Sequence, residues 1–169
     1  MGEIQSSINQ GLSAIAGATL ATKHLANQKA ANELKKAELG VELTKEQEAV
    51  YQADQALNAN SLEVSKEMQK DLDPAVADNP NLTEDSYLEL KQKQAGEVAE
   101  AAMKDFSDRK LDYLMGAQKS KPSSKRLDMA NKAFMEAKDA VMARRQLKYD
   151  LDMAKKRVDV TKQALEGVK

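Results

Sequence analysis

Apolar residues recur at seven-residue spacing in two long stretches of the chain, and this spacing constrains the fold more than any other feature. In the first stretch the repeated residues are Leu43, Val50, Leu57 and Val64. In the second stretch Leu151, Val158 and Leu165 have this spacing, and Leu147 lies one helical turn before Leu151 on the same side. Such a repeat places apolar side chains along one side of an α-helix and is typical of helices that pack as coiled coils.

The composition agrees with long helices and thin apolar seams. Of the 169 residues, 41% are hydrophobic but only 4% are aromatic, and there are just 3 prolines. Alanine fills many of the seam positions, so each helix buries little surface by itself and needs partners for stability. The sequence therefore predicts an all-α fold, an elongated array of long helices or coiled-coil hairpins, assembled in an oligomer or a larger particle.

Helix-breaking residues set the expected boundaries. Asp73-Pro74 and Asn79-Pro80 predict a loop, because the residue before a proline is displaced from the helical region. Gly, Ser and Pro between residues 116 and 125 predict a second loop. The expected segments are an uncharged helix over 1–22, a long helix over 23–72, a loop over 73–82, a helix over 83–116, a basic loop over 117–124 and a basic helix over 125–169.

The apolar pattern changes phase at two places. Ala30, Leu34, Ala37 and Val41 follow one helical face, and the seven-residue repeat that starts at Leu43 follows another. A second change of phase falls near Arg144. Such changes indicate a stutter or a bend in a coiled-coil helix.

The segment 4–22 carries no charge between Glu3 and Lys23. Isoleucine and leucine repeat every three or four residues, and small residues recur at four-residue spacing, which lets helix backbones approach closely. Two interpretations stay open: a helix that packs in an oligomer seam, or a helix that inserts conditionally in a membrane. The residues that would form its apolar face and its close-packing positions are Ile4, Ile8, Gly11, Leu12, Ala14, Ile15, Gly17, Ala18 and Ala21.

The net charge of −1 hides an asymmetry along the chain. Residues 1–116 carry 12 Lys and Arg against 20 Asp and Glu, a net charge of −8, whereas residues 117–169 carry 14 against 7, a net charge of +7. One interpretation is that the basic C-terminal helix pairs with acidic helices of its own chain or of a neighbour. The other is that it contacts phosphates of nucleic acid or membrane, or another acidic partner. The best candidates for such a partner contact are Arg144, Arg145, Lys148, Lys155, Lys156 and Arg157.

The nucleic-acid interpretation is the weaker one. Phosphate binding needs positive charge displayed along a face, but Asp150, Asp152 and Asp159 interleave with the basic residues. A single ring, Tyr149, lies among them, which gives little support for base stacking.

The residue types also argue against an enzyme. The chain has no cysteine and a single histidine, His24, so neither a thiolate site nor a histidine zinc site is available within one chain. The sequence contains no glycine-rich phosphate loop, nucleophile elbow or calcium loop. We therefore expect no catalytic residue, no metal and no cofactor.

The N-terminal third resembles small internal or minor virion proteins of bacteriophages, including DNA pilot and ejection proteins. The resemblance covers residues 1 to 60 and lies in Met1-Gly2, followed by INQGLSAIAGATLAT and then KHLANQKAANELKK. It implies a non-enzymatic virion protein that aids genome delivery through helical self-assembly and membrane contact. Its implied location is the particle interior or the portal or tail region, and the host envelope during infection. Its implied partners are further copies, other virion proteins, a membrane and, with less support, DNA.

Two other roles fit the same sequence. One is a structural head, neck or scaffold component that docks onto other virion proteins. The other is a coiled-coil adaptor unrelated to any virus.

Overall fold

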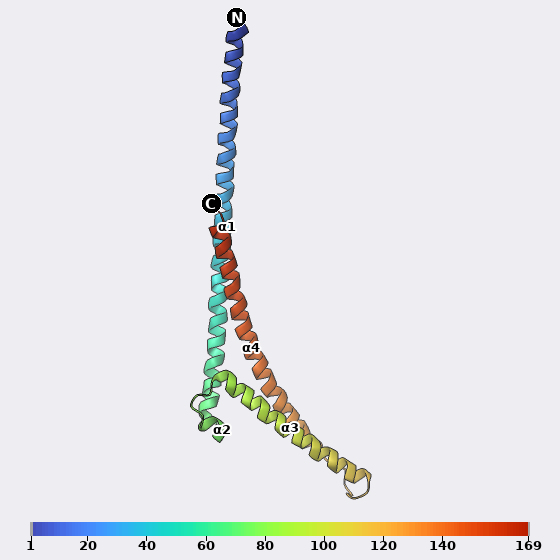
Figure 1. The fold of residues 1–169 in the computed structure, drawn as a ribbon. Helices are drawn as coiled ribbons and strands as arrows, with labels where there is room; N and C mark the ends of the chain where they lie inside the picture. Colours follow the sequence, from blue (N-terminus) through green and yellow to red (C-terminus); the bar gives the residue numbers. More distant parts are fainter. Residues whose placement is uncertain (1, 169) are drawn as a thin grey trace. The chain divides into compact units, whose positions relative to one another are not determined.

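The fold consists of helices and connecting loops. The computed structural model describes the backbone of residues 2–168 and the side chains of residues 18–168. Within this range the helices are α1 (Gly2–Lys70), α2 (Pro74–Ala77), α3 (Glu84–Leu114) and α4 (Lys125–Glu166), as Figure 1 shows. No strand occurs in the range described, so the predicted all-α class is confirmed.

Local chemistry accounts for the ends of the shorter helices. The Asp73 side chain accepts a hydrogen bond of 3.0 Å from the N–H of Ala75 and so caps α2, which begins at Pro74. The Thr83 hydroxyl accepts a hydrogen bond of 3.1 Å from the N–H of Ser86 and caps α3. After α3 the chain turns at Gly116, where φ is +78°, a conformation that glycine adopts without steric cost. The expected loop over 73–82 thus contains the short helix α2.

Helix α1 is continuous across the expected boundary at residue 22, and it also continues through Gly40. A single glycine costs a helix only about 1 kcal/mol, which a helix of 69 residues tolerates. The phase change at Gly40 is therefore a change of face and not a break. Nine residues separate Leu34 from Leu43 and Val41 from Val50, and at about 100° per residue this is half a turn, so the two apolar faces lie on opposite sides of α1.

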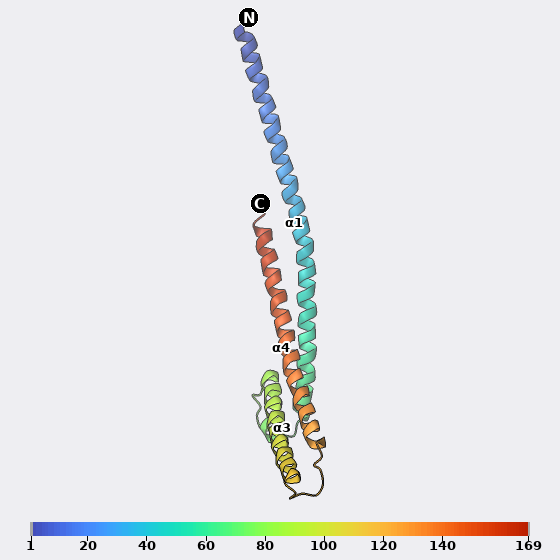
Figure 2. The same ribbon diagram turned by 90° about the vertical axis from the view of Figure 1, so that its right-hand side faces the viewer.

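The chain divides into two compact units, of which the first comprises Met1–Val50 and Ala154–Lys169. In this unit the end of α4 lies alongside α1, as Figures 1 and 2 both show. Leu43 and Val50 of α1 are half-buried, and Val158 and Thr161 of α4 are buried. Helix α1 extends beyond the end of α4, and its residues 18–38 are exposed on every side.

The second unit, Tyr51–Met153, contains the end of α1, all of α2 and α3, and the first part of α4. Its main core joins all four helices through Val64, Val76, Tyr87, Leu88 and Val141. A second core cluster lies between α3 and α4 and consists of Ala99, Ala102, Leu127 and Ala130, with Phe106 and Phe134 packed against it.

A glycine lets α3 and α4 pack closely in this second unit. A Cβ atom at Gly96 of α3 would lie 3.2 Å from the ring of Phe134 on α4. The absence of a side chain at Gly96 therefore leaves room for that ring.

The buried positions of α4 alternate in steps of three and four residues, as expected for a coiled-coil seam. Around Arg144 two steps of three follow each other, from Val141 to Arg144 and from Arg144 to Leu147. The change of phase predicted near Arg144 is therefore present. Its consequence is that a charged residue occupies an inward position of the helix.

Candidate functional site

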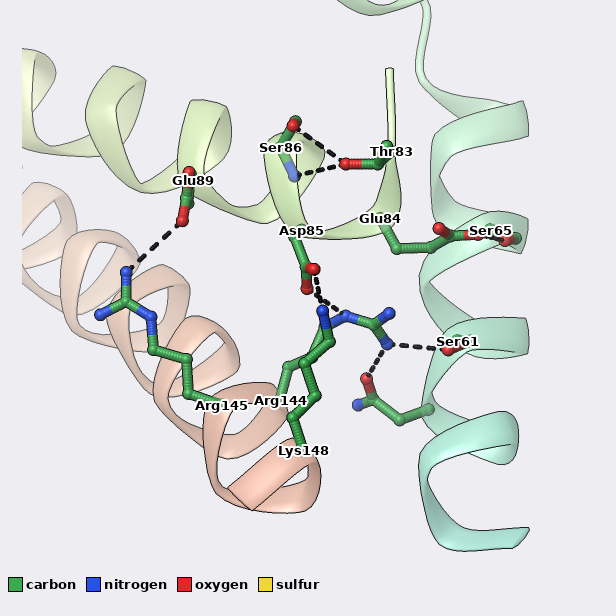
Figure 3. A network of polar contacts seen from close by, with 11 residues as sticks. Ser61, Ser65, Thr83, Glu84, Asp85, Ser86, Glu89, Arg144, Arg145 and Lys148 are labelled. Carbon is green, nitrogen blue, oxygen red and sulfur yellow. Dashed lines mark hydrogen bonds and ion pairs between the residues drawn. The ribbon is translucent and has the colours of Figure 1, made fainter. Parts of the chain in front are cut away.

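The most distinctive polar feature of the second unit is the side chain of Arg144, which is only 8% exposed. Its Nε donates a hydrogen bond of 2.6 Å to Oδ1 of Asp85 on α3. Its Nη1 donates to Oδ1 of Asn60 at 3.0 Å and to Oγ of Ser61 at 2.9 Å, both on α1. One guanidinium group thus connects three helices, as Figure 3 shows.

Each partner of Arg144 is positioned by its own helix. Asp85 lies in the first turn of α3, where the Thr83 cap fixes the start of the helix and the helix dipole favours a negative charge. Asn60 and Ser61 lie on the inward side of α1, one turn before the buried Val64. Arginine suits this position because its planar group donates several hydrogen bonds in fixed directions.

Further contacts surround this arginine. Lys148 donates to the second carboxylate oxygen of Asp85. Arg145 reaches Glu89 at 3.4 Å, and both of these side chains are mostly exposed. On the other side, the Ser65 hydroxyl donates a hydrogen bond of 2.7 Å to Glu84. Contacts from both α1 and α4 therefore hold the first turn of α3.

These contacts shift the pKa values of the two acids in that turn. Partial burial of Asp85 opposes its ionisation, but the hydrogen bonds from Lys148 and Arg144 outweigh this effect and hold the pKa of Asp85 below its usual range. The hydrogen bond from Ser65 likewise lowers the pKa of Glu84. Both groups are therefore ionised and electrostatically anchored at neutral pH.

A second polar cluster fixes the turn between α1 and α2 against α3. The Tyr87 hydroxyl donates to Asp71 at 3.0 Å, the Lys91 ammonium lies 2.6 Å from the same carboxylate, and Gln94 donates to Asp73 at 2.9 Å. The contact with Lys91 and the N–H of Asp73 lower the pKa of Asp71. Burial and the neighbouring Asp71 raise the pKa of Tyr87 to about 12.

The chemistry of both clusters is that of structural anchors. The pKa values of Asp71, Glu84 and Asp85 move downward, away from neutrality, whereas a general acid or base needs a value near the working pH. Over the residues that the structure describes, no group of three or more His, Cys, Asp or Glu side chains is placed to hold a metal ion.

The basic residues singled out in the sequence fall into two sets. Arg144, Arg145 and Lys148 contact acids of α3 within the second unit. This is the arrangement expected if the basic helix pairs with acidic helices of its own chain. Lys155, Lys156 and Arg157 are exposed on the part of α4 that belongs to the first unit.

The predicted seam residues all face inward to some degree. Val64, Leu151 and Val158 are buried. The remaining seam residues are half-buried, namely Leu43, Val50, Leu57, Leu147 and Leu165.

The structure describes the side chains of only the last residues of the uncharged N-terminal segment. Ala18 and Ala21 are exposed. The other residues of this set lie outside the range 18–168 in which side chains are described, namely Ile4, Ile8, Gly11, Leu12, Ala14, Ile15 and Gly17. In the part of the chain that is described, no helix combines the length and the hydropathy needed to cross a membrane.

Sequence reasoning missed the partners of Arg144, although a signal for them existed. Asn60 interrupts the apolar seam of α1, and Arg144 stands where the seam of α4 changes phase. A polar residue on each of two seams is the pattern from which a buried polar contact between the helices could have been predicted.

Comparison with known proteins gives no relative of this chain. No family model, no curated protein and no solved structure matches it.

Proposed function

We propose that this chain is a non-enzymatic assembly protein of a bacteriophage particle, in which long helices associate with further copies and aid delivery of the genome. The main support for assembly is the exposure of residues 18–38 of α1, which precede the part of this helix that packs against α4. In this region Leu20, Leu25 and Leu34 are 67%, 64% and 62% exposed. A single helix surrounded by water on all sides is marginally stable, and packing against another helix supplies the missing stability.

One side of this exposed helix has the pattern of a coiled-coil seam. Leu20, Asn27, Leu34 and Val41 follow each other at seven-residue spacing, and Ala30 and Ala37 lie between them on the same side. We call these six residues the rear face. Leu34 and Val41 lie about 180° around the helix from Leu43 and Val50, which face α4. The rear face is therefore available to another chain without displacing α4.

The rear face fits a second copy of the same chain. An asparagine at one core position of a coiled coil sets register and oligomeric state, because it pairs best with a polar partner at the same level. Asn27 has this position between Leu20 and Leu34. The opposite side of the same region also carries Leu25, but Gln28, Asn32 and Lys36 interrupt it.

Light scattering of the purified full chain during size-exclusion chromatography tests the assembly role. We expect a mass that rises with concentration to a multiple of the monomer mass of 18.6 kDa, because the thin seam gives reversible association. A mass of one monomer at every concentration would contradict the proposal.

The genome-delivery part rests on the uncharged segment 4–22 and on its resemblance to phage ejection proteins. We expect the full chain to release dye from anionic liposomes, because an uncharged helix with an apolar side buries that side in the lipid boundary. The double variant Ile8→Asp and Ile15→Asp should abolish release, because it places two charges on that side. Self-association without dye release, or equal release by the variant, would exclude this part and leave a purely structural virion role.

A further inference from the structure

A groove between α3 and α4 lies close to the loop that connects them, in the second unit of the chain. Its apolar floor consists of Val98 and Ala102 from α3 and Met129 and Ala130 from α4. It has a volume of about 510 Å³, enough for several side chains of a bound partner. Ala102 and Ala130 are buried but small, so the space above them stays open.

Apolar side chains at the edges of the groove are exposed to water. Val98 is 58% exposed and Met129 is 65% exposed. Methionine is flexible and polarisable, and it is a frequent contact residue in grooves that receive helices. Contiguous apolar surface of this kind marks an interaction site when polar residues border it.

The charged residues that line the groove are all cations, namely Arg109, Lys125 and Arg126. Arg109 also contacts Asp105 at 3.2 Å, in an exposed pair along α3. Across the residues described, Lys125 and Arg126 form no ion pair. The nearest acid on α4, Asp128, accepts a hydrogen bond from the Ser124 hydroxyl.

We propose that this groove is the docking site for an acidic amphipathic α-helix of a partner protein. The apolar floor would receive the apolar side of that helix, and the three cations would attract the acids on its flanks. Duplex DNA fits less well, because phosphates would pair with the cations but would leave Val98 and Met129 in water. The proposal is independent of the rear face, since the two surfaces lie on different helices.

The test is fluorescence anisotropy of a labelled synthetic peptide titrated with the full chain. The probe is an amphipathic helix of about five turns, with leucine on one side and glutamate on the other. We expect saturable binding that weakens about tenfold at high salt, because the attraction is screened. The double variant Lys125→Glu and Arg126→Glu, and separately Met129→Glu, should each weaken binding at least about tenfold.

A matched control separates the groove from overall charge. Lys132→Glu with Lys138→Glu makes the same charge change at exposed positions of α4 outside the groove lining, and it should keep most of the affinity. Circular dichroism confirms that each variant remains helical. The proposal is overturned if the peptide does not bind, if the control weakens binding as much as the groove variants, or if duplex DNA binds at the groove and the peptide does not. It is also overturned if groove variants lower the mass of the unliganded chain, because a second copy would then be the occupant.

Discussion

Replacing Arg144 by alanine is expected to lower the free energy of unfolding by about 3 kcal/mol. The substitution removes a side chain that is 8% exposed and makes hydrogen bonds to both α1 and α3. It leaves Asn60 and Ser61 without this donor and leaves Asp85 with Lys148 as its remaining partner. A polar group held away from water that loses its hydrogen bond costs more than the bond contributed. Urea unfolding followed by circular dichroism gives the change.

Arg145 provides the matched control for this prediction. It neighbours Arg144 in sequence, but its side chain is 64% exposed and its contact with Glu89 measures 3.4 Å. Arg145→Ala should therefore change the free energy of unfolding by less than about 1 kcal/mol. Equal effects of the two substitutions would show that burial of Arg144 does not matter for stability. The loss of unfolding free energy for Arg144→Lys should lie between the losses for Arg144→Ala and Arg145→Ala, because lysine keeps the charge but cannot reach three acceptors with one planar group.

Leu88→Ala is the other substitution with a large expected effect, about 3 kcal/mol of unfolding free energy. Leu88 of α3 is 6% exposed and belongs to the core that joins the four helices of the second unit. Truncation removes buried methyl groups and leaves a cavity among Val64, Val76 and Val141, which come from three other helices. The same unfolding assay measures the loss.

Leu72 makes the control for Leu88 within the same unit. It follows α1 and is 90% exposed, so Leu72→Ala should leave the free energy of unfolding within about 0.5 kcal/mol of the parent. A small effect of Leu88→Ala, or a large effect of Leu72→Ala, would contradict the packing described for the junction of the four helices.

The sequence predicts the helices of this fold well because their apolar residues are periodic and their ends carry specific residues. Pro74, Thr83 and Gly116 mark helix boundaries by local backbone chemistry, which acts without tertiary contacts. The inward orientation of Leu43, Val64 and the other seam residues follows from the helical spacing of the apolar residues alone.

Other features depend on contacts distant in sequence and could not be predicted in the same way. The hydrogen bonds from Arg144 to Asn60 and Asp85 span 84 and 59 residues. Their existence depends on how three helices pack together, which local patterns do not specify. The sequence also suggested Arg144, Arg145 and Lys148 as contacts for a partner, whereas in the structure they contact α3 of the same chain. The net charge of a segment does not show whether its basic residues contact a partner or another helix of the same chain.

The phase change at Gly40 is a change in which side of α1 carries the apolar seam. The sequence pattern alone allowed a stutter or a bend, but helix α1 runs through this point without interruption. The rear face, which includes Leu34 and Val41, and the repeat that starts at Leu43 therefore point in opposite directions. One side of α1 serves the pairing with α4, and the rear face is left for a partner.

Light scattering of Leu34→Glu and Leu25→Glu tests directly whether the rear face of α1 mediates assembly. The two leucines are 62% and 64% exposed on the same helix. Nine residues separate them, so they lie about 180° apart around the helix. We expect Leu34→Glu to reduce the mass to that of a monomer, 18.6 kDa, whereas Leu25→Glu should leave the assembly intact. Equal behaviour of the two variants, or dissociation by Leu25→Glu alone, would contradict assembly through the rear face.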